Sequence, residues 1–211
     1  MPALDRHAST WHTVEPTLQV ADIILVHGKG PLNRAIQRAS KSYWNHVALV
    51  LQPAQPAVGI KGAFIIGAID RGIEIHRLRK YSEHLDRFDI GVKRFPGLTL
   101  ETRKRIVSFL LNELDASYDY TRLFAYLAAT LIAPFSPRLY DYIRRAARTA
   151  HPNSYVCSTF IQRAFFLSVP SDRELQAFAR SGMTSLEELE EITPADFAHS
   201  PHYEWIFNPH E

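Results

Sequence analysis

The stretch NSYVCSTFI, residues 153–161, carries the only cysteine of this 211-residue chain, Cys157. From Cys157 onward, Ile161 and Ala164 fall on one face of an α-helix, so their spacing predicts a helix that begins near the cysteine. Free backbone N–H groups and the positive dipole end at a helix N-terminus favour a thiolate and can hold a developing oxyanion. Cys157 is therefore a candidate nucleophile, and a free cysteine that only fills the core is the alternative.

The segments upstream of this helix have the pattern of an antiparallel sheet. Apolar or alternating runs predict strands at 20–26, 46–51, 62–69, 72–78 and 88–95, with an amphipathic helix at 32–40. From Thr99, a typical N-cap residue, the period becomes helical. Further helix starts are predicted from Ser171 with Glu174, Ser185 with Glu188, and Thr193-Pro194. Strands first and helices later predict an α+β fold, in which an antiparallel sheet packs against helices.

The composition is that of a globular chain, with 46% hydrophobic and 22% charged residues. We expect a single domain, 1–211, with a polar leader at 1–19 and a helical insertion at 120–152. Lys plus Arg number 24 and Asp plus Glu 22, spread along the chain, so charge predicts no nucleic-acid partner. The N-terminal residues lack the apolar core of a secretory signal, so we expect a cytoplasmic protein, with signal-independent export left open.

The residues 123–135, LFAYLAATLIAPF, form the most apolar stretch. The stretch is too short to span a bilayer, which requires about 20 residues. A buried helix or hairpin is one interpretation, and a flap that contacts a membrane or covers a substrate is the other.

His46 opens the apolar strand predicted at 46–51, and a base at a strand end is placed to accept a thiol proton. A histidine that merely satisfies its own hydrogen bonds is the alternative. Asn45 and Tyr155, which lie beside His46 and Cys157 in the sequence, are candidates for substrate binding. We expect no metal and no cofactor, because one cysteine cannot form a cysteine-based zinc site and the pair His199 and His202 lacks an acid at catalytic spacing.

Five short motifs occur in a characteristic order: ADIIL (21–25), NHVALV (45–50), YDY (118–120), YVCS (155–158) and TPADF (193–197). In this order the chain resembles the YiiX/YaeF group of permuted papain-like amidases, in the NlpC-type superfamily, with lecithin:retinol acyltransferase-like proteins as more distant relatives. The resemblance runs from about residue 20 to about residue 200. It implies a circularly permuted papain-like fold, with histidine before cysteine in the chain.

The resemblance also implies residue roles. Cys157 matches the nucleophile and His46 the base, while Tyr118 stands where these families often carry a tyrosine that positions the substrate or the oxyanion. The alternative for Tyr118 is a core tyrosine, and Asp22 is expected to hold a turn. In these relatives a polar residue, often glutamate, follows on the next strand and orients the histidine, but here Gly67 stands at that position.

The third catalytic member therefore stays unassigned, with Asp70 and Glu74 the nearest carboxylates and a water or a backbone carbonyl as substitutes. The predicted function is a thiol-dependent amidase or peptidase that acts on a small peptide, amino-acid-derived or acyl substrate. Lipid acyl transfer or thioester cleavage, with membrane contact through 123–135, is the second interpretation. A binding module that has lost turnover is the third.

Overall fold

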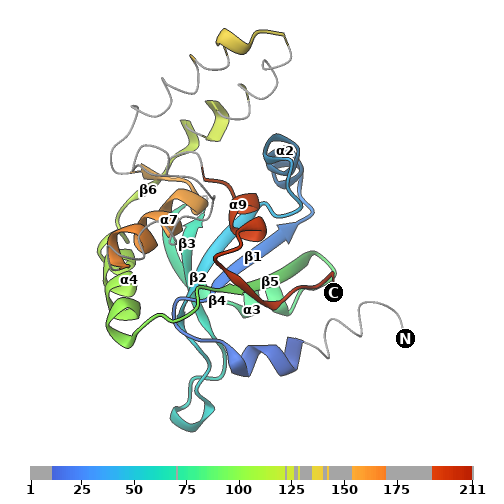
Figure 1. Ribbon diagram of the computed structural model, residues 1–211. Helices are drawn as coiled ribbons and strands as arrows, with labels where there is room; N and C mark the ends of the chain where they lie inside the picture. Colours follow the sequence, from blue (N-terminus) through green and yellow to red (C-terminus); the bar gives the residue numbers. More distant parts are fainter. Residues whose placement is uncertain are drawn as a thin grey trace.

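A six-stranded antiparallel sheet organises the chain (Figure 1). Its strands are β1 (Ile23–Gly28), β2 (His46–Gln52), β3 (Phe64–Ile69), β4 (Gly72–Arg77), β5 (Phe88–Arg94) and β8 (Glu204–Phe207), in the order β4-β3-β2-β1-β5-β8. The computed structural model describes residues 11–69, 71–121, 123–125, 128, 135–139, 142, 154–169 and 192–210. In these residues no helix has the length and apolar character needed to cross a membrane.

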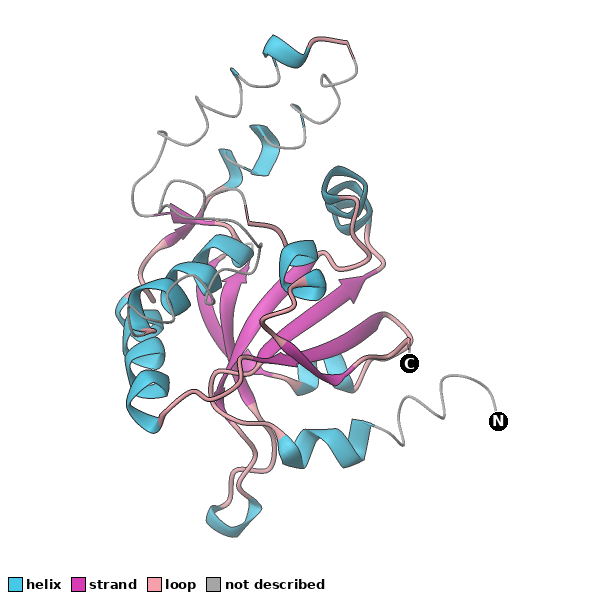
Figure 2. Ribbon diagram, viewed as in Figure 1, coloured by secondary structure: helices cyan, strands magenta, loops and turns pink. Residues whose placement is uncertain are grey.

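Helices and one short strand pair complete the fold (Figure 2). The elements are η1 (Glu15–Thr17), α2 (Pro31–Ser40), η2 (Pro56–Val58), α3 (Arg79–Ser82), α4 (Leu100–Asn112), α7 (Cys157–Ser168) and α9 (Pro194–His199). The strand pair is β6 (Ser117–Tyr118) with β7 (Ser154–Tyr155), and it runs parallel. Thr99 caps α4 by accepting a hydrogen bond from the Thr102 N–H at 3.1 Å. A capping box between Thr193 and Asp196 starts α9.

Both faces of the sheet bury apolar side chains, and alternation along the strands decides which side chain faces which layer. On β2, Val47 and Leu49 face the layer that contains α4 and α7. Ala48 and Val50 face the opposite layer. Trp11, 3% exposed, and Leu18, 4% exposed, also belong to that second layer. The second half of the expected leader is therefore part of the core. The sequence did not indicate this, because isolated apolar residues among polar neighbours form no pattern.

The predicted α+β fold is confirmed, and the five predicted strands form at nearly the predicted places. The first strand begins at Ile23 because the residues before it form a turn, in which the Asp22 carboxylate accepts the Gln19 N–H at 2.7 Å. The edge strand β8 was not predicted, since four residues are too few to show a strand pattern in the sequence. Of the expected insertion at 120–152, residues 120–121, 123–125, 128, 137–139 and 142 are helical. The helix starts expected at Ser171 and Ser185 lie outside the described residues.

Asp22 also anchors the sheet through a bidentate ion pair. Arg94, at the end of β5, donates from Nε to Oδ1 and from Nη2 to Oδ2 of Asp22, both at 2.7 Å. Nη2 also donates to the Thr17 carbonyl at 2.9 Å. The Asp22 side chain is fully buried, so the role expected for Asp22, to hold a turn, is confirmed and extends to joining η1, β1 and β5.

Candidate active site

Cys157 is the first residue of α7, as the spacing predicts. The parallel pair of β6 and β7 positions the start of this helix, since Tyr118 lies opposite Tyr155 and the Asp119 N–H donates to the Tyr155 carbonyl at 3.1 Å. Ser158 donates from its hydroxyl to the Ile192 carbonyl and thereby ties the start of α7 to the segment before α9. Two chain segments far apart in sequence therefore hold the cysteine in place.

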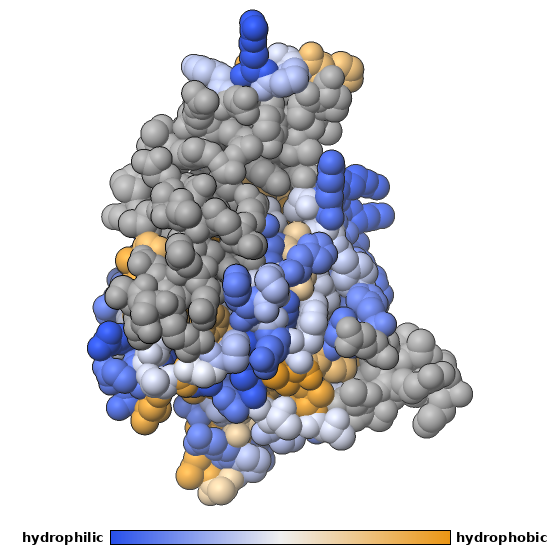
Figure 3. Space-filling view, in the orientation of Figure 1, coloured by the Kyte–Doolittle hydropathy of each residue, from blue (hydrophilic) through white to orange (hydrophobic). Residues whose placement is uncertain are grey.

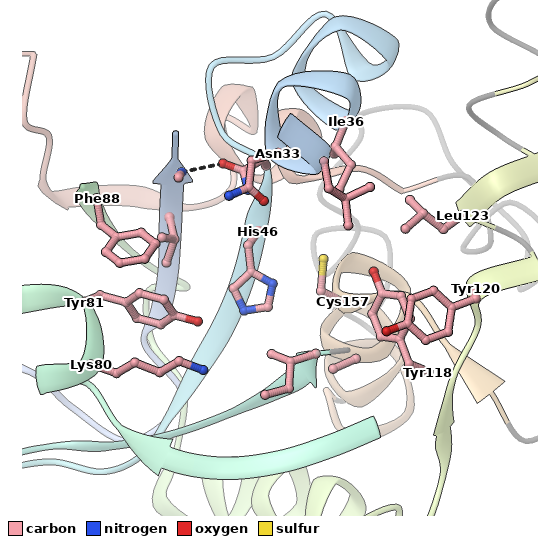
Figure 4. A pocket seen from close by; sticks show the side chains of 16 residues that line it. Asn33, Ile36, His46, Lys80, Tyr81, Phe88, Tyr118, Tyr120, Leu123 and Cys157 are labelled. Carbon is pink, nitrogen blue, oxygen red and sulfur yellow. Dashed lines mark hydrogen bonds between the residues drawn. The ribbon is translucent and has the colours of Figure 1, made fainter. Parts of the chain in front are cut away.

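His46 and Cys157 meet at one cavity of about 330 Å³. His46 is the first residue of β2 and pairs with Val26 of β1 within the sheet. Helix α7 packs against β2 on one face of this sheet. Figure 4 shows the His46 ring beside the Cys157 sulfur, with one ring nitrogen on the side of the sulfur and the other on the side of Tyr81 and Lys80. The structure thus brings together the two residues that the sequence marks as nucleophile and base.

The Cys157 side chain is only 4% exposed, and this burial determines its charge state. Burial raises the pKa of the thiol from 9.0 to about 11. Backbone hydrogen bonds from Val47, Ser158 and Cys157 itself favour the thiolate and act against this shift. The predicted effect of the helix N-terminus is therefore present, but desolvation outweighs it, and the resting group at neutral pH is a thiol.

His46 rests as a neutral imidazole. Its Nε2 is buried and has no hydrogen-bond partner in the described part of the chain. The pKa of His46 is lowered from 6.5 to about 3, mainly by burial and in addition by the nearby His76 and Lys80. A neutral imidazole beside a neutral thiol is the state from which a general base acts, because the ring can accept a proton only while it carries none on the nitrogen that faces the thiol.

Gly67 of β3 lies close against β2, so that a side chain at this position would require its neighbours to shift. A Cβ at this position would lie 3.2 Å from the Ala48 Cβ and 3.5 Å from the Val47 carbonyl oxygen of β2. Glu74 is the partner of Gly67 across the β3–β4 ladder and is half-buried, but it is not among the groups that shift the pKa of His46. Asp70 lies outside the described residues. Both described side chains that shift the pKa of His46 by their charge, His76 and Lys80, are thus basic, where an acid was expected.

An unexpected cluster lies on the far side of His46. The Tyr81 ring centroid is 6.3 Å from that of His46 and 5.6 Å from that of His76. Both ring nitrogens of His76 are buried without a hydrogen-bond partner in the described residues, and the pKa of His76 is lowered to about 4 by burial and by Lys80. Lys80 and Tyr81 come from the four-residue helix α3, where a run of charged residues gave no sign of a site.

The other predicted site residues have separate surroundings. Tyr118 lines the cavity, and its ring is 5.0 Å from that of Tyr120. Asn45 also lines the cavity, but its Oδ1 already accepts hydrogen bonds from the Gly28 N–H at 2.7 Å and from the Gln37 amide at 3.2 Å. Asn45 therefore fixes the wall of the cavity.

Tyr155 lies behind the site. Its hydroxyl donates to Glu113 Oε2 at 3.0 Å and its ring packs against Phe160, with centroids 5.4 Å apart. It is not among the residues that line the cavity. The structure gives this tyrosine a packing role behind the start of α7, and not the place beside the substrate that its position next to Cys157 suggested.

An antiparallel sheet with a thiol at a helix start and an earlier histidine on a strand defines the class of papain-like folds in permuted chain order. The chain belongs to the family of permuted papain-like amidases YaeF/YiiX, the C92 family, whose model matches residues 17–125, just over half of the chain. This matched segment includes His46 and Tyr118, whereas Cys157 follows it.

A solved structure gives the same fold. The crystal structure of the metalloprotein YiiX from Escherichia coli O157:H7 is similar with a TM-score of 0.57 and 12% sequence identity, over 90% of this chain and 97% of that one. No curated protein matches the chain. The resemblance drawn from the five motifs is therefore confirmed as to family and fold.

The raised pKa of Cys157 predicts a slow, alkaline alkylation profile. We expect the rate of alkylation by iodoacetamide to keep rising with pH beyond about 8.5, where a free thiol is half ionised. In urea the midpoint should return to that of a free thiol, because unfolding removes the burial that favours the neutral form. Because its pKa is higher in the folded protein, the thiol keeps its proton more firmly in the folded than in the unfolded chain. Its contribution to the free energy of unfolding is therefore complete below pH 9.0 and is lost as the pH rises towards about 11. A plateau below pH 8 in the folded protein would contradict this prediction.

Proposed function

We propose that the chain is a thiol-dependent amidase or peptidase that cleaves an amide bond of a small peptide or amino-acid-derived substrate through an acyl-enzyme on Cys157. The observation that supports this most is the meeting of Cys157 at the start of α7 and His46 at the start of β2 in one cavity. Membership of the amidase family supports the same class of reaction.

In the proposed mechanism His46 accepts the thiol proton while the Cys157 sulfur attacks the substrate carbonyl carbon. The carbonyl oxygen becomes an oxyanion, which backbone N–H groups at the start of α7 would hold. The imidazolium then donates its proton to the leaving amine as the C–N bond breaks. Water, deprotonated by His46, hydrolyses the thioester and restores the thiol.

Tyr118 is proposed as the group that positions the substrate, because it lines the cavity beside Tyr120. The three backbone hydrogen bonds to the sulfur would favour the thiolate at the moment of attack, when substrate replaces water in the cavity. A resting neutral pair is compatible with this mechanism, since the proton moves only as the new bond forms.

Lipid acyl hydrolysis or transfer is the second candidate, and exposed apolar side chains that follow the cavity residue Leu123 in the sequence favour it. Leu123 lines the cavity, whereas Phe124 is 57% and Phe135 89% exposed. Figure 3 shows hydrophobic and hydrophilic side chains next to one another at the tip of the molecule. Exposed apolar side chains of this kind suit contact with a membrane surface.

The related YiiX is named a metalloprotein, but the described side chains of this chain do not suit a resident metal at the site. A catalytic zinc takes three protein ligands and a structural zinc four. In the described residues, no group of three or more His, Cys, Asp or Glu side chains gathers closely enough to hold a metal ion. The proposed mechanism therefore uses Cys157 and His46 without a metal.

Acid quenching followed by intact-mass measurement tests the proposal. The panel comprises amino-acid p-nitroanilides, short-chain acyl thioesters and phospholipid vesicles. We expect a single acyl adduct on Cys157 and release of nitroaniline from the amide substrates. Adducts only from lipids or thioesters, with vesicle binding that Phe124→Asp and Phe135→Asp abolish, would support the second candidate. No adduct and no product from any substrate would contradict an enzyme and favour a binding module.

A further inference from the structure

The described residues that line the cavity carry charge of one sign only. Sixteen of the described residues line the cavity, and among these Lys80 is the one side chain that is charged at neutral pH, since His46 is neutral. None of these sixteen residues carries a carboxylate. The remaining lining is mostly apolar or aromatic, with Leu32 and Ile36 from α2 and Leu123 on the other side.

Lys80 is an exposed side chain that lies beside His46, on the side of the ring away from Cys157. Its Nζ is 5.7 Å from the centroid of the Tyr81 ring. Figure 4 shows this Nζ and the Tyr81 hydroxyl pointing into the space beside His46, across the ring from Cys157. No ion pair or hydrogen bond from Lys80 to another described residue is present. The charge is thus available to a molecule in the cavity.

This cation opposes the proton transfer that the proposed reaction needs. Lys80 disfavours the charged form of both His46 and His76. When His46 takes the proton from Cys157 it becomes a second cation close to the first. An anion bound beside Lys80 would remove much of this repulsion, because opposite charges nearby favour the imidazolium. A substrate that brings a negative charge would therefore assist its own attack.

We propose that Lys80 is a specificity-determining residue that binds a carboxylate of the substrate, so that the site takes amides with a free carboxylate close to the scissile bond. The apolar wall from Leu32, Ile36 and Leu123 would hold an uncharged side chain or acyl group of the same molecule. Peptides with a terminal carboxylate next to the cleaved bond have this chemistry. The substrate class in this inference rests on the proposed function, whereas the test of the inference requires no turnover.

Two alkylating reagents of nearly equal size test the charge preference without any turnover. Iodoacetate carries a carboxylate and iodoacetamide does not. With each, the Cys157 sulfur forms a bond to the methylene carbon as the C–I bond breaks, iodide leaves and the thiol proton passes to His46 and then to water. The measured quantity is the ratio of the two second-order rate constants, divided by the same ratio for free cysteine.

We expect this normalised ratio to be about five- to tenfold higher in the native protein than in Lys80→Met, and to fall with added salt. Lys80→Arg should retain most of the preference. Lys61→Met is the matched control, because Lys61 is an exposed lysine that does not line the cavity. The rate with iodoacetamide should agree within about twofold between the native protein and Lys61→Met. In Lys80→Met this rate should stay equal or rise, because a cation that opposes the proton transfer has been removed. A rate that does not fall shows that a variant is folded and its thiol accessible.

Equal ratios in the native protein and Lys80→Met would overturn the proposal, and so would a failure of both reagents to label Cys157. A Lys80-dependent preference for iodoacetate, in a protein that forms no acyl adduct with any substrate, would uphold the carboxylate site and reject the amidase. Acyl adducts without the preference would uphold the amidase and reject the carboxylate site.

Discussion

Replacing Cys157 with serine will lower turnover of an amide substrate by about 10³- to 10⁶-fold, the range seen when a nucleophile that acts as part of a unit is removed. A serine hydroxyl is far less acidic than a thiol, and the neutral His46 is then too weak a base to activate it. Initial rates measure the loss, and thermal unfolding checks that the buried site still packs. Residual activity above about one tenth of the native rate would exclude Cys157 as the nucleophile.

The same experiment has a second arm at His46. A general base contributes typically 10²- to 10⁴-fold, so His46→Gln should lose activity within that range. If the two residues act as one unit, the double variant will be no slower than the Cys157→Ser variant alone. Multiplicative losses would mean that His46 acts on the fold or on the substrate instead of on the thiol.

The local patterns around His46 and Cys157 were each weak, and the pairing of the two residues came from the resemblance to the family. His46 opens an apolar strand and Cys157 opens an apolar helix, and both patterns follow from the alternation of buried side chains. The resemblance also placed Gly67 where relatives often carry an acid, and this alignment stays a prediction. The close approach of a Cβ at this position to Ala48 depends on the spacing between β2 and β3 and appears only in three dimensions.

Other parts of the site were beyond sequence reasoning for the same reason. Lys80 and Tyr81 lie on a helix of four residues, too short for a periodic pattern, and they reach the cavity only through the fold around β4 and β5. The charge state of the thiol also depends on more than the helix start, which was the one influence visible in the sequence. Proximity to a helix start is a local property, whereas the desolvation that outweighs it depends on how the whole chain covers the sulfur.

Replacing Arg94 with methionine will lower the free energy of unfolding by about 3 kcal/mol, because it leaves the Asp22 carboxylate buried without its counter-charge. Asp22 is fully buried, and the Arg94 side chain is 18% exposed. The hydrogen bond from Gln19 would remain, but it does not neutralise the charge. Urea unfolding of the native protein and the variant measures the difference.

Two comparisons separate this charge effect from lost packing and from chemistry. The double variant Asp22→Asn with Arg94→Met should recover part of the stability, since the remaining amide is uncharged. Activity per folded molecule should stay unchanged in Arg94→Met, because Asp22 precedes β1 whereas His46 pairs with Val26 further along this strand. Arg94 lies at the end of β5 beyond Lys93, which pairs with Ile23 at the start of β1, so the ion pair lies at the opposite end of the sheet from the cavity. If Arg94→Met kept the stability of the native protein, water would have to reach Asp22 and solvate it. If Arg94→Met stayed folded but lost activity, the ion pair would control the position of His46 through β1.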